Sequence, residues 1–254
     1  MLNVTETGRD SNLPPVLLAH GLFGSGKNLG GIARRLAGDR RVLSVDMRNH
    51  GDSAWTESHS YDDLAGDLAR VIADHGGQMD VVGHSMGGKA AMWLALTRPQ
   101  HVNRLVVLDI APVTYDHDQQ GPLEAARGLD VRGVSLRSEA DRRLSETIAE
   151  PGVRAFLLQS LDLKAEPPRW KINLDLLAGE MDRLTGFPAT EGRHFDGPAL
   201  FLAGALSNYV LPKHEANIHA AFPQAQIRRI DGTGHWLHAE KPAEVASAVA
   251  GFLT

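Results

Sequence analysis

The sequence of 254 residues contains no cysteine. This absence excludes a disulfide framework, a thiolate nucleophile and a zinc site with cysteine ligands. An excess of positive charge is also lacking, because 26 Lys and Arg stand against 31 Asp and Glu, for a formal net charge of −5. We therefore expect no general attraction to nucleic acid or to an anionic membrane, and no nucleic-acid partner.

Long apolar runs are missing as well. No stretch approaches the roughly 18 consecutive apolar residues that cross a bilayer, so we expect no membrane span. Residues 1–10 are polar and lack the basic and then apolar pattern of a signal peptide. From these two absences we infer a cytoplasmic protein. The length is enough for one α/β domain with a substantial buried core.

Short apolar runs alternate with helical patterns along the chain. This alternation predicts an α/β fold with a mostly parallel central sheet and crossover helices on both faces. The runs are nearly continuous in apolar residues, as expected for strands that are covered on both sides. We expect strands near 2–7 and at 16–19, 42–45, 80–82, 105–108, 200–203 and 227–230, and helices at about 29–37, 61–75, 86–97, 214–222 and 242–252.

The segment at about 113–196 breaks this alternation, because it has helical periodicity and no convincing buried strand. We interpret it as a helical lid insertion in a single α/β-hydrolase domain, residues 1–254. It would cover the carboxyl edge of the sheet, where ligands bind in open α/β folds. Its apolar side chains, which include Leu157, Leu161 and Trp170, either select the substrate or pack the insertion onto the core.

A candidate nucleophile lies in the segment Gly83–Gly87, which reads G-H-S-M-G and fits the motif G-x-S-x-G. An apolar run precedes the motif and a helix-forming stretch follows it, which is the context of the nucleophile elbow in α/β-hydrolases. The glycines permit a sharp turn, and the helix directs its N-terminal N–H groups at the reaction centre. The alternative is a chance match in a loop. We expect Ser85 to be the nucleophile.

A candidate base follows the last expected strand. His235 lies in the segment G-T-G-H-W, and a serine hydroxyl needs a base of near-neutral pKa to attack at neutral pH. The order of serine and then histidine agrees with an α/β-hydrolase triad. The alternatives are a surface histidine and a metal pair with His238, for which no third ligand is evident.

The candidate acid is Asp109, which follows the expected strand 105–108. Hydrolases of this fold often carry the acid after the strand before the last, but residues 203–208 read A-G-A-L-S-N and contain no carboxylate. Asp109 lies at the same edge of the sheet and could hold the histidine tautomer, or it could merely cap a turn. Asp175 in the insertion is the second candidate, and Glu215 is the third.

Two backbone N–H groups are candidates for an oxyanion hole. One is that of Met86, the residue after the nucleophile. The other should come from the segment H-G-L-F-G at 20–24, where we favour Leu22 and keep Phe23 as the alternative. We expect His20 to support this loop by hydrogen bonding.

The same loop also reads G-x-x-x-x-G-K at 21–27, which nearly matches a phosphate-binding P-loop. The residue after Lys27 is Asn28, where a Ser or Thr would bind magnesium. No apolar strand that ends in a metal-binding Asp accompanies it. We therefore expect no nucleotide, no metal and no other cofactor.

Together these motifs resemble the YbfF-type esterases, a branch of the α/β-hydrolase superfamily. The resemblance covers nearly the whole chain, and its most specific segments are HGLFGS, DMRNHG and DIAPV. It implies a serine esterase or thioesterase that cleaves carboxylic esters or acyl thioesters through an acyl-enzyme, without a cofactor. It supports Ser85 and His235, and it fits Asp109, because the family tends to have a serine at the position of Ser207. The chain departs from the family at 205–206, Ala-Leu, where Gly-Asn is usual.

Two other functions fit the same residues. The Ser and His pair could serve C–C bond hydrolysis or a lyase reaction, and a hydrolase scaffold could bind a ligand without chemistry. The second alternative would be expected to lack the nucleophile or the base, and neither is missing. The sequence therefore favours an enzyme whose partner is a small-molecule acyl ester or thioester.

Overall fold

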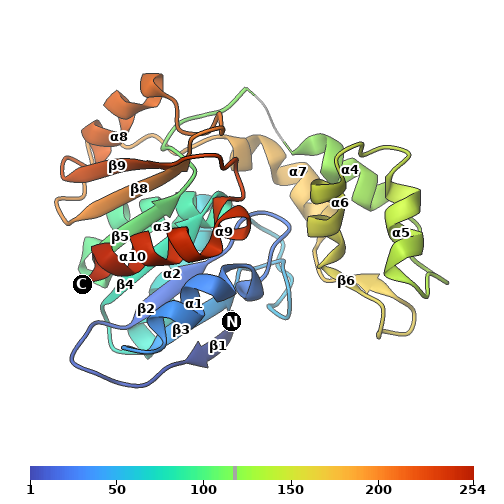
Figure 1. The fold of residues 1–254 in the computed structure, drawn as a ribbon, viewed down its shortest axis with the longest axis horizontal. Helices are drawn as coiled ribbons and strands as arrows, with labels where there is room; N and C mark the ends of the chain where they lie inside the picture. The colour runs from blue at the N-terminus through green and yellow to red at the C-terminus, as the bar shows by residue number, and fades with distance from the viewer. Residues whose placement is uncertain (117–118) are drawn as a thin grey trace.

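The structure, a computed structural model, describes residues 1–116 and 119–254. Its central sheet has seven strands in the order β1-β3-β2-β4-β5-β8-β9, with helices on both faces (Figure 1). β1 runs antiparallel to β3, and the other neighbouring strands run parallel. The α/β fold with a mostly parallel sheet is therefore confirmed. The strands are β1 Asn3–Thr7, β2 Val16–Ala19, β3 Val42–Asp46, β4 Met79–His84, β5 Val102–Leu108, β8 Ala199–Gly204 and β9 Ala225–Ile230.

Five helices surround the sheet, and each lies within one residue of its expected bounds. Their buried residues recur at helical spacing, as Leu64, Leu68 and Ile72 do in α2. These helices are α1 Gly30–Leu36, α2 Tyr61–Asp74, α3 Met86–Thr97, α8 Glu215–Ala221 and α10 Pro242–Leu253. Shorter helical turns, which have too few residues to show a period, are η1 Gly26–Leu29, η2 Pro99–His101, η3 Pro212–His214 and α9 Leu237–Glu240.

The strands bury both of their faces. In β2, Val16 and Leu18 belong to one apolar cluster together with residues of α1 and α10, whereas Leu17 and Ala19 belong to another with residues of α2 and α3. Successive side chains of a strand point to opposite faces, so one short strand contributes to two cores. The carboxyl ends of these strands are consequently well fixed, and so are the positions of the residues that follow them.

Between β5 and β8 the chain forms the helices of the predicted insertion, which lie together at one side of the sheet (Figure 1). Two strands of two residues each, β6 and β7, form an antiparallel pair among them. The sequence does not predict these strands because two residues cannot show an alternating pattern. The elements are α4 Gln120–Gly128, α5 Arg137–Leu144, α6 Pro151–Leu158, β6 Leu161–Asp162, β7 Arg169–Trp170 and α7 Leu174–Thr185.

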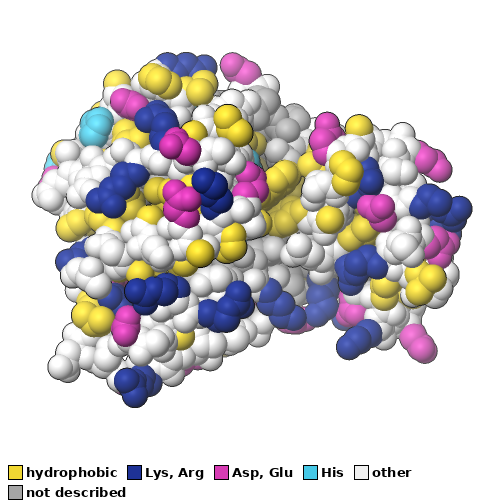
Figure 2. Space-filling model, viewed as in Figure 1, with side chains coloured by type: hydrophobic (Ala, Val, Ile, Leu, Met, Phe, Trp, Pro, Cys, Tyr) yellow, Lys and Arg dark blue, Asp and Glu magenta, His cyan; other side chains and the backbone are white. Residues whose placement is uncertain are grey.

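Figure 2 shows hydrophobic side chains gathered where the insertion meets the rest of the molecule, with basic and acidic side chains intermixed around them.

Within residues 1–116 and 119–254, no helix is both long and apolar enough to cross a membrane.

Candidate active site

Ser85 lies at the sharp turn between β4 and α3. Its backbone has φ 51° and ψ −120°, a conformation that is sparsely populated by residues with a Cβ atom. A Cβ atom on Gly83 would overlap the carbonyl of Gly87, and one on Gly87 would overlap the carbonyls of Ala19 and His20. The close approach of these segments therefore requires the two glycines of the motif.

The structure brings Ser85, His235 and Asp109 together from three separate loops. The Nε2 atom of His235 lies 3.1 Å from Oγ of Ser85, and its Nδ1 atom lies 2.8 Å from Oδ2 of Asp109. Because a carboxylate can only accept a hydrogen bond, Nδ1 carries the proton and Nε2 presents a lone pair to the serine hydroxyl. This arrangement allows the imidazole to take the serine proton.

The carboxylate of Asp109 is fully buried and has two further donors. The backbone N–H of Gly204 donates to Oδ1 at 2.9 Å, and the hydroxyl of Ser207 donates to Oδ2 at 2.5 Å. Together with Nδ1 of His235, these donors engage both oxygens of the carboxylate. The loop after β8, which carries no acid of its own, thus supports the acid at the end of β5.

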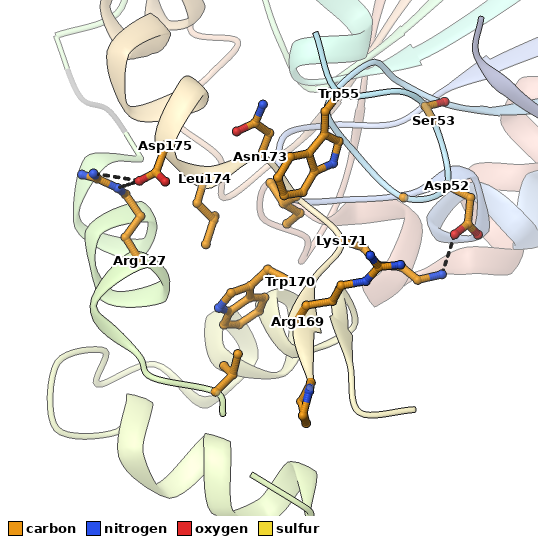
Figure 3. Close-up of a pocket in the computed structure, with 14 residues that line it drawn as sticks. Asp52, Ser53, Trp55, Arg127, Arg169, Trp170, Lys171, Asn173, Leu174 and Asp175 are labelled. Atoms are coloured by element: carbon orange, nitrogen blue, oxygen red, sulfur yellow. Dashed lines mark hydrogen bonds and ion pairs between the residues drawn. The ribbon is translucent and has the colours of Figure 1, made fainter. Parts of the chain in front are cut away.

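The other two candidate acids are engaged elsewhere in the described chain. Asp175 pairs with Arg127 at 2.9 Å, and Glu215 pairs with Arg229 at 3.0 Å. Figure 3 shows Asp175 and Arg127 at the rim of a separate cavity of about 590 Å³. Neither carboxylate is a partner of His235 among the contacts that the structure describes.

The loop Gly21–Gly24, called the oxyanion loop after its expected role, offers two backbone N–H groups, and their hydrogen bonds differ. The N–H of Phe23 donates to Nε2 of His50 at 3.2 Å, whereas within the described residues the N–H of Leu22 has no hydrogen-bond partner. The N–H of Met86 begins α3 and precedes the hydrogen bonds of that helix. Leu22 and Met86 both line the cavity at Ser85, so their N–H groups are the better placed pair.

His20 supports this loop by hydrogen bonding, as the sequence predicts. Its Nδ1 donates to the carbonyl of Gly21 at 2.7 Å, and its Nε2 accepts from the N–H of Met47 at 2.9 Å. Burial lowers the pKa of His20 to about 4, so it stays neutral and can both donate and accept.

The cavity at Ser85 is narrow, at about 50 Å³, and the insertion contributes part of its wall. The contributing side chains are not the ones that the sequence singles out. Leu157, Leu161 and Trp170 are buried within the apolar core, and none of them is among the described residues that line this cavity. The packing interpretation is therefore the better one for these three. The insertion residues that do line the cavity are Tyr115, Gln119, Met181, Leu184 and Thr185.

Lys89 also lines the cavity, and the sequence analysis does not identify it. Its Nζ atom donates to the carbonyls of Thr185 at 2.8 Å and Gly186 at 2.6 Å, and it lies 4.8 Å from the centre of the Tyr115 ring. Burial lowers the pKa of Lys89 to about 7. Lys89 lies one helical turn after Ser85, the N-cap residue of α3, and its N–H donates to the carbonyl of Ser85 at 2.9 Å. This spacing of four residues is the signal that the sequence offers.

His235 itself is held by two aromatic side chains that the sequence analysis also misses. Tyr209 stacks on its ring at a centroid distance of 4.0 Å. His84 donates from Nε2 to the carbonyl of His235 at 2.9 Å. Tyr209 thus packs against the ring, and His84 holds the backbone of His235.

The metal and nucleotide alternatives find no support in the described residues. The ring of His238 packs against that of His84, with 4.4 Å between the ring centroids. No described group of three or more His, Asp or Glu residues could hold a metal ion. Asn28 accepts a hydrogen bond from the N–H of Ser25 at 2.5 Å, and the side chain of Lys27 is exposed. The P-loop-like segment is thus an ordinary capped turn.

Comparison with known sequences gives a consistent result. The family model for the alpha/beta hydrolase fold matches residues 14–242. The sn-1-specific diacylglycerol lipase ABHD11 of Mus musculus is 42% identical over 253 residues, covering 96% of this chain and 82% of that protein. Esterase YbfF of Escherichia coli (strain K12) is 36% identical over 244 residues, covering 95% and 94%.

Solved structures show the same similarity. A marine microorganism esterase has a TM-score of 0.93 at 34% identity, covering 99% of this chain and 98% of that one. The thioesterase domain from the curacin biosynthetic pathway has a TM-score of 0.72 at 21% identity, covering 98% and 94%. The second similarity is one of fold alone.

Proposed function

Because the chain belongs to the α/β-hydrolase family, we propose that it is a serine hydrolase that cleaves carboxylic esters or acyl thioesters. The observation that carries the proposal is the hydrogen-bonded chain from Ser85 through His235 to Asp109, with distances of 3.1 and 2.8 Å. These distances lie within the range in which a base can take the proton of a nucleophile.

In the proposed reaction, Oγ of Ser85 attacks the carbonyl carbon while His235 Nε2 takes the serine proton. The N–H groups of Leu22 and Met86 stabilise the negative charge on the carbonyl oxygen. His235 then gives its proton to the leaving alcohol or thiol, and the acyl group remains on Ser85. Water attacks this acyl-enzyme with His235 again as base. Asp109 holds the ring and stabilises the imidazolium in both halves.

We further propose that residues at about 113–196 are a lid insertion in a single hydrolase domain and that the insertion selects the acyl group. Met181 and Leu184 give the cavity at Ser85 an apolar wall on this side. Acyl sites are mostly apolar with few polar groups, which fits this lining.

The substrate class draws on the relatives. Since one of them is named an sn-1-specific diacylglycerol lipase and another an esterase, we propose that neutral acyl esters, acylglycerols among them, are substrates. We also propose a cytoplasmic location, which fractionation of cells that express the tagged chain tests.

The test is a hydrolysis profile over p-nitrophenyl esters, acyl thioesters and diacylglycerols of increasing chain length. We expect turnover of at least one ester series, and a loss of roughly 10⁶-fold in kcat for Ser85→Ala. Asp175→Asn is the matched control, because Asp175 pairs with Arg127 away from Ser85, and it should keep activity. Full activity of Ser85→Ala would exclude the proposed mechanism.

A further inference from the structure

Phe23 adopts a backbone conformation that needs support from its surroundings. It lies in a turn in which the N–H of Gly24 donates to the carbonyl of Gly21 at 3.0 Å. Its φ of 65° is left-handed, which is unfavourable for a residue with a Cβ atom. Such a conformation persists only where neighbouring groups hold it. The preceding N–H in this turn is that of Leu22, so the shape of the turn sets where that group points.

The N–H of Phe23 is held by His50. It donates to Nε2 of His50 at 3.2 Å, and Nδ1 of the same ring lies 2.9 Å from the carbonyl of Arg48. Nδ1 must therefore carry the proton, which leaves Nε2 as an acceptor. Burial lowers the pKa of His50 well below its usual value, so the ring keeps this neutral state. His50 thus fixes the orientation of the peptide between Leu22 and Phe23.

The carbonyl of Phe23 is held by a residue of the helical insertion. Ser160 follows α6 and donates from Oγ to this carbonyl at 2.7 Å. Ser160 is 7% exposed and Phe23 is 3% exposed, so water has little access to compete for the bond. A segment 137 residues away in sequence thereby holds the other side of the same residue.

The insertion also reaches His50. His50 forms an antiparallel bridge with Ile172. Next to it, the backbone N–H of Asn173 donates to the carbonyl of Asn49 at 3.0 Å, and the Asn173 side chain donates to that of Asn49 at 3.2 Å. Both hydrogen bonds on Phe23 therefore trace back to the insertion, one directly and one through the segment that carries His50.

We propose that Ser160 and His50 are positioning residues that clamp Phe23, so that the insertion holds the oxyanion loop in its active shape. The inference rests on the proposed function, in which the N–H of Leu22 stabilises the oxyanion. Without the clamp the turn relaxes and this N–H moves away from the reacting oxygen. The insertion then contributes to the rate of the reaction as well as covering the substrate.

The experiment compares Ser160→Ala with Gln159→Ala. Gln159 is the neighbouring residue, and its side chain makes a different contact between insertion and core, a 2.9 Å hydrogen bond from Asn28. We would measure kcat and KM for a short p-nitrophenyl ester, and the affinity for a boronic acid, whose tetrahedral adduct on serine places an oxygen in the oxyanion hole.

For Ser160→Ala we expect kcat to fall roughly 10- to 100-fold, with KM changed less than about 2-fold, because the lost interaction forms only in the transition state. Boronate affinity should fall by a similar factor. Gln159→Ala should stay within about 2-fold of wild type on all three measures. Ser160→Cys keeps the shape of the side chain with a larger atom and a weaker donor, so its kcat should lie between those of wild type and Ser160→Ala, and it provides the comparison if Ser160→Ala does not fold.

Equal effects of Ser160→Ala and Gln159→Ala would overturn the inference, and so would a rise in KM with unchanged kcat. Labelling with a fluorophosphonate separates this result from a failure of the proposed function. If wild-type Ser85 is labelled and Ser160→Ala or Ser160→Cys retains full kcat, only the clamp is wrong. If wild-type Ser85 is not labelled, the proposed function itself is wrong.

Discussion

The hydroxyl of Ser207 lies 2.5 Å from the carboxylate of Asp109, although 98 residues separate them in sequence. Ser207 occupies the loop after β8, where hydrolases of this fold often carry their acid. Here the loop donates hydrogen bonds to an acid at the end of the neighbouring strand, from this serine and from the N–H of Gly204. In the proposed triad, the acid therefore lies one strand away from that position and still contacts His235, at 2.8 Å.

Replacement of Asp109 by asparagine should lower kcat by up to roughly 10⁴-fold, since the amide favours the wrong tautomer of His235. Asp175→Asn is the matched control and should be nearly normal, because Asp175 is exposed and pairs with Arg127. Steady-state kinetics with circular dichroism as a folding check would measure both. The reverse pattern, with Asp175→Asn inactive and Asp109→Asn active, would place the acid in the insertion.

Truncation of Met181 should change the acyl-chain preference. Met181 lines the narrow cavity at Ser85, so Met181→Ala should raise kcat/KM for longer acyl chains relative to acetate esters. Leu157 is fully buried away from that lining, and Leu157→Ala should instead lower stability by about 2–5 kcal/mol. A chain-length series and thermal unfolding separate the two effects. Identical profiles for both variants would argue against a role of the insertion in selectivity.

Acid should destabilise the protein before the carboxylates titrate. Burial lowers the pKa of His20 to about 4, of His59 to about 3 and of His238 to about 4. In the unfolded chain these rings titrate near 6.5, so the unfolded state binds more protons than the folded state between that pH and about 4. Their contribution to stability is fully present above pH 6.5 and is lost as the pH falls through this window.

Thermal unfolding from pH 8 to pH 4.5 measures this effect. Tm should be nearly constant above pH 7 and should fall steadily below 6.5. His59→Gln should flatten the slope, whereas the exposed His219, replaced in the same way, should leave it unchanged. A Tm that does not change down to pH 4.5 would contradict the assignment of buried neutral histidines.

Removal of metal should not change activity, because the proposed chemistry uses only side chains and backbone N–H groups. Prolonged dialysis against a strong chelator should leave kcat within about 2-fold of its starting value. Metal analysis before and after the dialysis is the control. Loss of activity that added zinc restores would mean that the reaction depends on a metal.

The sequence predicts the sheet and its five flanking helices well, because strands buried on both faces are continuous apolar runs and the helices have clear periodicity. It also predicts Ser85 and His235 as site residues, since local motifs and neighbouring elements identify both. The sequence predicts Asp109 as the acid only partly by exclusion. Its hydrogen bond from Ser207 joins segments 98 residues apart, and such a contact leaves no local pattern. Ser160 is not found at all, since a side chain that bonds to a distant backbone carbonyl leaves no local pattern.

The most direct test of the account is whether Ser85 carries the acyl group. The protein would be mixed with a slowly hydrolysed p-nitrophenyl ester, quenched in acid within the first turnover and analysed by intact mass and peptide mapping. The account predicts a burst of about one p-nitrophenol per chain and an acyl adduct on Ser85 alone, absent in Ser85→Ala and strongly reduced in His235→Ala, which lacks the base for acylation. An acyl adduct on another residue, or turnover by Ser85→Ala at the wild-type rate, would contradict it.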